Sequence, residues 1–251
     1  LDDNPGYFLK NFEEGIQLAI SIIKGISEIH DRNVIHKDIN PSNIVYNPEI
    51  KGLNIIDFGL SSELSFENFD LSNINQLEGS LAYISPEQTG RINRNIDYRT
   101  VYYSYGITLY ELFLGHLPFN ASNAREWVHC QIAREAIPMH MIQKNVPKTL
   151  SKIVAKLMEK TAERRYQSPF GIISDLTKCL EEYKSDSTFT DFVPGINDIS
   201  RKFQISQKLY GRDSEIELML SAFEHLPLYN SMFVSVKGLP GSGKSSLVGE
   251  L

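Results

Sequence analysis

The chain has 251 residues, of which 41% are hydrophobic and 22% are charged, so it can form one large or two modest domains with a buried core. Its formal net charge of −6 argues against nucleic-acid binding, and no run of Lys and Arg suggests an anionic membrane surface. No apolar run reaches about 18 residues and no signal peptide opens the sequence, so we expect a cytoplasmic protein without membrane insertion.

The first predicted element is a helix that begins near Asn11. Apolar residues recur at three- and four-residue steps as far as Ile29, a pattern that predicts a core-facing helix. Asn11 and Glu14 have the spacing of a capping box at its start. A polar loop stiffened by Pro41 follows this helix.

Two short β-rich runs come next, at residues 44–46 and 53–56. Residues 47–52 join them and contain Asn, Pro and Gly, so the segment predicts a hairpin. Because Asn43 and Asp57 flank this hairpin, it should bring them near each other.

A polar loop and then several helices are predicted in the next part of the sequence. Residues 60–76 are rich in Ser, Asn and Glu and predict a mobile loop of the kind that covers a site. Residues 98–114 are almost wholly apolar or aromatic, which predicts a helix buried on all sides. Ser168 and Pro169 predict the N-cap and first position of a later helix. Further amphipathic helices are expected at residues 124–134, 150–160 and 169–183.

The histidine and cysteine residues show no metal-binding pattern. His30 has no second ligand-type residue four positions on, so we expect it to pack at the end of the first helix. Cys130 and Cys179 have no Cys or His at ligand spacing, which predicts buried or half-buried thiols in a reducing compartment. Neither a disulfide nor a structural metal site is expected.

The composition changes after residue 183. Residues 184–206 carry Ser, Asp, Thr, Pro and Gly without an apolar period and predict a linker. A helix at residues 213–226 and a β-rich run at 232–236 should follow. The next segment matches the phosphate-binding pattern G-x-x-x-x-G-K-[ST], placed after a strand and at the start of a helix. The residues expected to bind nucleotide phosphates are Gly238, Gly241, Ser242, Gly243, Lys244 and Ser245, with Ser245 also a ligand of Mg²⁺.

Three motifs in the first half point to one chemistry. Residues 36–43 place Asp38 and Asn43 five positions apart in one polar loop, which can hold a base and a metal ligand together. Residues 57–59 read Asp-Phe-Gly, and residues 85–87 read Ser-Pro-Glu at the end of a later polar segment. In order and spacing these motifs resemble the catalytic loop, the metal-binding Asp-Phe-Gly and the end of the activation segment of eukaryotic-type serine/threonine protein kinases.

The resemblance implies transfer of the γ-phosphate of ATP to Ser and Thr hydroxyls of a protein. It implies that Asp38 accepts the proton of the substrate hydroxyl and that Asn43 and Asp57 bind Mg²⁺. Glu87 would pair with Arg165 and tie the activation segment to the helical lobe.

Two positions depart from the family pattern. Asn40, which we count with Asp38 as a catalytic residue, stands where most such kinases have Lys, so a positive charge is missing. Val101 replaces an Asp that holds the loop backbone in kinases. Two functions therefore stay open: an active kinase, or a pseudokinase scaffold or regulatory module attached to a P-loop signalling ATPase. The glycine-rich loop, strand Lys and helix Glu that would discriminate them are expected upstream of Leu1.

The resemblance extends to the order of domains. Residues 1–183 resemble the C-terminal lobe of a kinase domain, without its N-terminal lobe, and residues 207–251 resemble the truncated start of a P-loop ATPase. Large signalling proteins that also carry a sensor and often a histidine kinase have this order. We therefore expect a mainly α-helical kinase-like lobe with short β-hairpins, followed by the start of an α/β P-loop NTPase domain. The expected partners are a protein substrate or signalling partner and further domains of the same polypeptide.

Overall fold

The computed structural model describes residues 8, 11–47, 49–50, 52–63, 81–92, 94–185, 192–199, 211–224, 233–239 and 241–248. The chain divides into two compact units, Leu1–Lys202 and Phe203–Leu251, which are considered separately below. Within the described ranges, no helix combines the length and the hydropathy needed to span a lipid bilayer.

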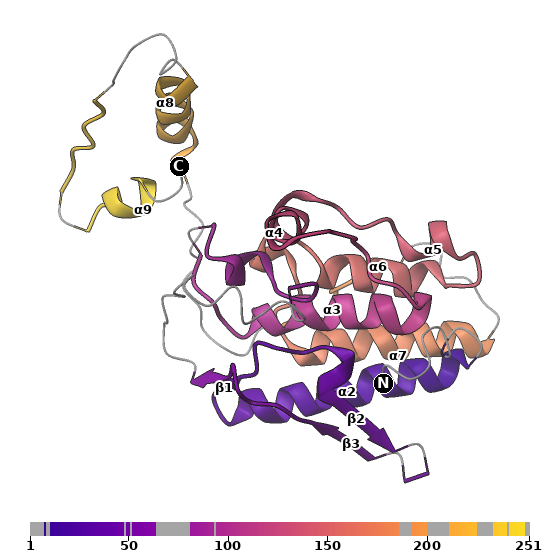
Figure 1. Ribbon diagram of the computed structural model, residues 1–251. Coiled ribbons are helices and arrows are strands. Elements are labelled where there is room, and N and C mark those ends of the chain that lie inside the picture. The colour runs from indigo at the N-terminus through magenta and orange to yellow at the C-terminus, as the bar shows by residue number, and fades with distance from the viewer. Residues whose placement is uncertain are drawn as a thin grey trace. The chain divides into compact units, whose positions relative to one another are not determined.

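The first unit is mainly helical, as the sequence predicts. Its long helices are α2 (Phe12–Asp31), α3 (Arg99–Leu114), α6 (Lys148–Leu157) and α7 (Pro169–Ser185). Helix α2 contacts α3 and α7, and α6 contacts the same two helices, so the four helices enclose one core (Figure 1). The shorter helices are α4 (Ala124–Ala133), α5 (Met139–Ile142) and the 3-10 turns η1 (Pro41–Asn43), η3 (Pro86–Thr89) and η4 (Ala162–Arg164).

Helix α3 lies at the centre of this unit. Of its 16 residues, 14 are buried, which confirms the prediction of a helix enclosed on all sides. Two of its buried tyrosines have hydrogen-bonded hydroxyls: Tyr105 donates to the Ala19 carbonyl at 2.8 Å and Tyr103 to the Gln131 side chain at 2.9 Å. A Cβ atom at Gly106 would lie 2.8 Å from that of Leu157, so this glycine permits the close approach of α6.

Two helix starts were predicted from capping residues, with different outcomes. The Ser168 hydroxyl accepts a hydrogen bond from the Gly171 amide at 3.1 Å, which confirms Ser168 as the N-cap of α7. Asn11 precedes α2, but its side chain forms no capping hydrogen bond. Its φ of −117° and ψ of 58° lie outside the extended conformation that turns such a side chain toward the first helical turn. The predicted capping box is therefore wrong.

The isolated histidine and cysteine residues belong to the core, as predicted. His30 is buried at the end of α2, with its ring centroid 5.9 Å from those of Tyr98 and Tyr102. Cys130 and Cys179 are both buried free thiols. Their role in the described part of the chain is packing.

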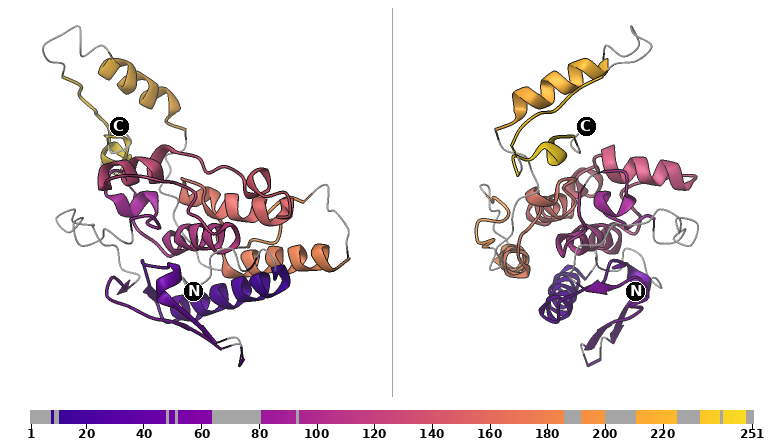
Figure 2. Two further views of the ribbon diagram at one scale, coloured as in Figure 1. Left: turned by 45° about the vertical axis from the view of Figure 1, so that its right-hand side comes forward. Right: turned by 90° about the vertical axis from the view of Figure 1, so that its left-hand side faces the viewer.

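The strands form two antiparallel pairs: β2 (Ile44–Asn47) with β3 (Gly52–Ile55), and β1 (Val34–Ile35) with β4 (Ser62–Glu63). The first pair confirms the predicted hairpin, which Figure 2 shows on the α2 side of the unit. The second pair corrects the expectation of a mobile loop from residue 60 onward, because the backbone of β1 holds residues 62–63 in a strand. Residues 64–76 of that expected loop lie outside the described residues.

Part of the segment expected as a linker packs on the helical unit. Residues 192–199, here called the strap, contact the start of α7 through Asp198. One Asp198 oxygen accepts from the Gln167 amide at 2.6 Å and the other from the Ser168 hydroxyl at 2.7 Å. In the middle of the strap, the Gly195 amide donates to buried Asp175 at 2.6 Å. Helix α7 itself continues to Ser185, beyond the predicted end of the lobe.

The described part of the second unit contains α8 (Asp213–Glu224) and α9 (Lys244–Val248). Both predicted helix starts are confirmed at these residues. Residues 233–239 form no strand, which corrects the expected β-run at 233–236; residue 232 lies outside the described residues. A strand needs a hydrogen-bonded neighbour, and within the described residues of this unit none is present. Phe233 is accordingly 92% exposed.

Candidate active site

The carboxylate of Asp38 is held by two asparagine side chains. Asn40 Nδ2 donates to Asp38 Oδ1 at 2.9 Å, and Asn43 Nδ2 donates to Asp38 Oδ2 at 2.9 Å. Both asparagines are buried, whereas Asp38 is half-buried. One amide N–H on each oxygen fixes the orientation of the carboxylate and leaves it further lone pairs that can accept a proton.

Asn40 also builds the loop that carries it. Its Oδ1 accepts from the Asn43 amide at 3.2 Å and so caps η1, in which Pro41 occupies the first position. Both ends of the Asn40 amide are therefore used, one on Asp38 and one on the backbone. Asn40 orients the carboxylate but supplies no positive charge.

His36 anchors the beginning of the same loop. Its Nε2 donates to the Ile56 carbonyl at 3.0 Å, and its Nδ1 accepts from the Asp38 amide at 3.4 Å. Burial lowers the pKa of His36, although the Ile56 carbonyl and the carboxylates of Asp38 and Asp57 act in the opposite direction. A neutral imidazole suits both contacts, because one ring nitrogen donates and the other accepts.

Gln88, which sequence reasoning did not single out, ties this loop to the Ser-Pro-Glu motif. Its Nε2 donates to the Lys37 carbonyl at 2.8 Å, and its Oε1 accepts from the Ser85 amide at 3.0 Å. The one available signal was its place directly after Glu87 in the motif. The bond fixes the backbone next to Asp38.

Asp57 lies two residues after the end of β3. The Ile56 amide donates to the Asn43 carbonyl at 2.9 Å, so the two predicted metal ligands are brought together through the hairpin. Asp57 is exposed, and its Oδ1 accepts from the Gly59 amide at 3.2 Å. The ring of Phe58 lies 4.8 Å from that of His36, centroid to centroid.

Backbone strain occurs at two of these positions. Lys37 has φ of 64° and Asp57 has φ of 62°, in the left-handed region that residues other than glycine seldom adopt. Such a conformation costs about 1–3 kcal/mol and persists where the surroundings enforce it, often at functional sites.

The donor set near Asp57 fits a hard divalent cation. Mg²⁺ prefers oxygen ligands, which the Asp57 carboxylate and the Asn43 amide can supply. Within the described residues, no three His, Cys, Asp or Glu side chains cluster as a metal site. A Mg²⁺ ion here would therefore need further oxygen ligands, such as water and the phosphates of a bound nucleotide.

The predicted pair of Glu87 and Arg165 is confirmed. Arg165 Nη1 and Nη2 lie 2.6 and 2.8 Å from the two carboxylate oxygens of Glu87, and Thr100 donates to the same carboxylate at 2.8 Å. Burial opposes ionisation of Glu87, but the charge and hydrogen bonds of Arg165, with the bond from Thr100, outweigh it and keep the pKa of Glu87 below its usual value. The pair thus joins the Ser-Pro-Glu motif to the helices.

The position of Val101 shows why the replacement of the Asp expected from the family pattern matters. Val101 is fully buried in the apolar core at the start of α3. Its side chain has no hydrogen-bonding atom, so it cannot accept a bond from the loop as an Asp could. Among the described residues, His36, Gln88 and the capping amide of Asn40 hold the loop instead.

The glycine-rich segment of the second unit forms a turn that leads into α9. Gly241 and Gly243 have φ of 78° and 80°, which glycine adopts without strain. Lys244 Nζ donates to the carbonyls of Gly238 at 3.1 Å and Leu239 at 2.8 Å, so the side chain lies back over the turn. Beside it lies a pocket of about 340 Å³, whose lining includes Arg212, Ser242 and Lys244.

These features agree with the comparison of the sequence with protein families. The sequence model of the protein kinase domain matches residues 9–178, and the chain therefore belongs to the protein kinase domain family.

Individual relatives extend this result. A protein described as a probable serine/threonine-protein kinase from Clostridium perfringens is 35% identical over 68% of this chain and 24% of its own length. A second protein of that description, from Clostridium acetobutylicum, is 31% identical over 70% of this chain and 26% of its own length. Hybrid signal transduction histidine kinase G of Dictyostelium discoideum is 27% identical over 94% of this chain, but over 9% of its own length. The chain thus spans about a quarter or less of the length of these relatives.

Proposed function

We propose that this chain supplies the helical lobe of a protein serine/threonine kinase, which transfers the γ-phosphate of ATP to protein hydroxyls. The observation that carries the proposal is the fixed carboxylate of Asp38, held from both oxygens by Asn40 and Asn43. Phosphoryl transfer requires mainly that a base, the metal and the phosphates be positioned, and this loop provides such a base. Membership of the kinase family and similarity to the clostridial kinases support the same reaction.

In this proposal Asp38 accepts the proton of the attacking hydroxyl, and Asn43 and Asp57 hold Mg²⁺. Bound Mg²⁺ would neutralise charge that develops on the transferred phosphate. Asn40 keeps the Asp38 carboxylate in its orientation, and the Glu87–Arg165 pair holds the neighbouring segment against the helices.

The test is an Asp38→Asn substitution in the full-length protein, with phosphate transfer to a protein acceptor as the readout. We expect turnover to fall by roughly 10²- to 10⁴-fold, the usual effect of losing a general base, with nucleotide affinity nearly unchanged. Asp31→Asn is the matched control, because it removes one exposed carboxylate from the end of α2. Equal turnover in the Asp38 variant would refute the assignment.

A pseudokinase scaffold is the second candidate function. It is favoured by Val101 and Asn40, which remove a carboxylate under the loop and a positive charge beside it. In this case the unaltered protein would bind a partner, and binding would not depend on Asp38. Absence of any phosphate transfer, together with normal nucleotide or partner binding, would decide in favour of the scaffold.

We further propose that residues 207–251 begin a P-loop ATPase domain, joined to the kinase lobe in a multidomain signalling protein. The G-x-x-x-x-G-K-[ST] pattern, the glycine turn before α9 and the adjoining pocket support nucleotide binding there. The volume of that pocket lies within the range of about 300–1,000 Å³ typical of small-molecule sites. Similarity to the hybrid histidine kinase over 94% of the chain supports the multidomain context.

This second site can be tested apart from the first. Lys244→Ala in the full-length protein should abolish ATP photo-crosslinking near residues 238–245, because a positive charge on the phosphates is lost. Lys144→Ala is the control, since it removes the same charge from an exposed position outside that pocket. Unchanged labelling in the Lys244 variant would refute the P-loop assignment, and labelling of the kinase lobe should persist in both.

A further inference from the structure

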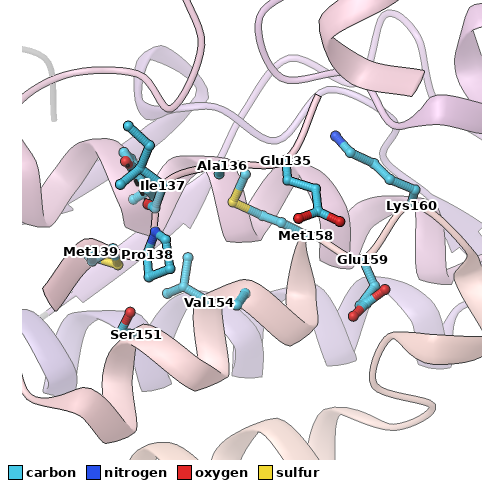
Figure 3. Close-up of a pocket in the computed structure, with 12 residues that line it drawn as sticks. Glu135, Ala136, Ile137, Pro138, Met139, Ser151, Val154, Met158, Glu159 and Lys160 are labelled. Carbon is cyan, nitrogen blue, oxygen red and sulfur yellow. Dashed lines mark hydrogen bonds between the residues drawn. The ribbon is translucent and has the colours of Figure 1, made fainter. Parts of the chain in front are cut away.

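A separate hollow lies in the first unit, here called the α6 pocket. It has a volume of about 240 Å³ and lies between α6, residues 135–139 and Tyr110 of α3 (Figure 3). None of its lining residues belongs to the loop of residues 36–43 or to residues 57–59. The proposed phosphate transfer therefore does not account for it.

The wall of the α6 pocket is fixed in place by hydrogen bonds. The Tyr110 hydroxyl donates to the Ile137 carbonyl at 3.1 Å, and the His140 ring lies 2.9 Å from the Ser151 hydroxyl. The first bond ties the segment before α5 to α3, and the second ties α5 to α6. A wall that is ordered before binding loses little conformational freedom when a ligand enters.

Most of the lining residues are apolar, and so are exposed residues next to the pocket. The apolar lining includes Ile137 and Pro138 before α5, Met139 at the start of α5, Val154 and Ala155 in α6, and Met158 directly after α6. Ile137 is 59% exposed, and Met141 and Ile142, which follow in α5, are 69% and 41% exposed. Clustered exposed apolar side chains of this kind mark interaction sites.

The volume favours a side chain over a free small molecule. Sites for small molecules usually measure about 300–1,000 Å³, and the α6 pocket falls below this range. One large apolar side chain of a bound peptide is a better match, with the exposed patch of α5 in contact with its neighbours.

The charged groups at the pocket indicate which charge a ligand should carry. Glu135 and Glu159 line one end, as Figure 3 shows, and within the described residues neither carboxylate forms a hydrogen bond or salt bridge. Lys160 also lines the pocket, but its ammonium is engaged by the Tyr103 hydroxyl at 2.8 Å and the Cys130 carbonyl at 3.2 Å. It also lies over the Phe119 ring, 4.7 Å from the centroid. Two carboxylates thus remain available for an incoming cation.

We propose that the α6 pocket docks a peptide segment of a partner protein that presents a large apolar side chain next to Arg or Lys. The apolar side chain fills the pocket between the loop and α6, while the basic group meets Glu135 and Glu159. Charge pairs at the rim add specificity and make binding weaker as salt rises. The site is a docking surface, distinct from the groups that act on the phosphate.

The test uses the full-length protein and fluorescein-labelled nonapeptides of Gly and Ser with a central Leu, Phe or Trp. In three matched sets the central residue is flanked on both sides by Arg, Ser or Glu. We expect fluorescence anisotropy to show at least about tenfold tighter binding of the Arg set than of the Glu set. Equal binding of the three sets, or no binding up to about 1 mM peptide, would overturn the proposal.

Two variants locate the binding. Ala155→Trp fills the pocket from an exposed position of α6, and Glu159→Lys reverses one rim charge. Each should weaken binding of the Arg set at least about tenfold, whereas Glu181→Lys, an exposed charge reversal on α7, should not. Thermal melting of each variant checks that it is folded. Undiminished binding by folded Ala155→Trp would also overturn the proposal, and Asp38→Asn should leave docking unchanged whether or not the kinase assignment holds.

Discussion

At the scale of single residues, Glu87 and Arg165 show how a charged pair can serve the architecture of the site. Their side chains are 4% and 0% exposed, so both charges are removed from water. Removing one partner of such a pair leaves an uncompensated buried charge, which typically lowers stability by about 3–5 kcal/mol. We therefore expect Glu87→Gln to lower the free energy of unfolding of the chain at pH 7 by about that amount, measured by urea denaturation.

The same pair predicts how the stability of the folded chain depends on pH. Because the pKa of Glu87 is lowered in the folded chain, the unfolded state binds more protons in acid. The stabilisation that ionised Glu87 gives to the folded chain is therefore fully present above the ordinary Glu pKa of 4.5. It is lost as the pH falls through the lower pKa that Glu87 has in the folded chain. Glu87→Gln should show a flatter loss of stability in this acid range than the unaltered chain. The exposed Glu181→Gln is the control, and parallel acid curves for the Glu87 variant and the unaltered chain would contradict the prediction.

Residue patterns predicted only part of this site. Asp38, Asn43 and Asp57 stand in short motifs, and the hairpin that brings Asn43 and Asp57 together is itself local in sequence. The bond from Gln88 to the Lys37 carbonyl joins positions 51 residues apart, and no local pattern encodes such a contact. The dual role of Asn40 was missed for a related reason, since it depends on the geometry of η1.

At the scale of elements, the strap of residues 192–199 depends on a few strong contacts. Asp198 accepts two hydrogen bonds at the start of α7, and a Cβ atom at Gly171 would come within 2.5 Å of its carboxylate. Hydrogen bonds to a charged group contribute about 1.5–3 kcal/mol each when buried, and less at this half-buried position. Asp198→Ala should therefore lower stability by about 1–3 kcal/mol and speed hydrogen exchange in residues 192–199.

A neighbouring residue provides the control for the strap. Asn197 is exposed and contributes one hydrogen bond, from Nδ2 to the Ser174 hydroxyl at 3.0 Å. Asn197→Ala should change exchange in the strap much less than Asp198→Ala does. If both variants exchange alike, the carboxylate is not what holds the segment.

The elements also show which parts of the fold a sequence pattern can predict and which it cannot. Apolar periodicity predicted α2 correctly, and the almost wholly apolar and aromatic composition of residues 98–114 predicted that α3 is buried on all sides. The strap has no such period, since polar bonds to distant residues hold it. The β-rich residues 233–236 have the composition of a strand, but composition supplies no neighbouring strand to pair with.

At the scale of the whole molecule, the described parts of the two units differ in how many hydrophobic side chains they bury. The connected hydrophobic core includes residues from Phe8 to Phe192, all in the first unit. Among the described residues of the second unit, Met219 and Leu247 are the buried hydrophobic side chains. A segment of fewer than about 50 residues seldom buries enough apolar surface to fold alone.

This contrast predicts the outcome of dividing the chain. The segment Leu1–Lys202 should keep a cooperative thermal transition with a midpoint close to that of the whole chain, because it retains the entire connected core. The segment Phe203–Leu251 by itself should show no cooperative transition by circular dichroism. A shorter first segment ending at Ser185 is the control, since it removes the strap and should melt at a lower temperature. A drop of more than about 5 °C for Leu1–Lys202, which corresponds to roughly 2 kcal/mol in a domain of this size, would show that the second unit contributes to the stability of the first.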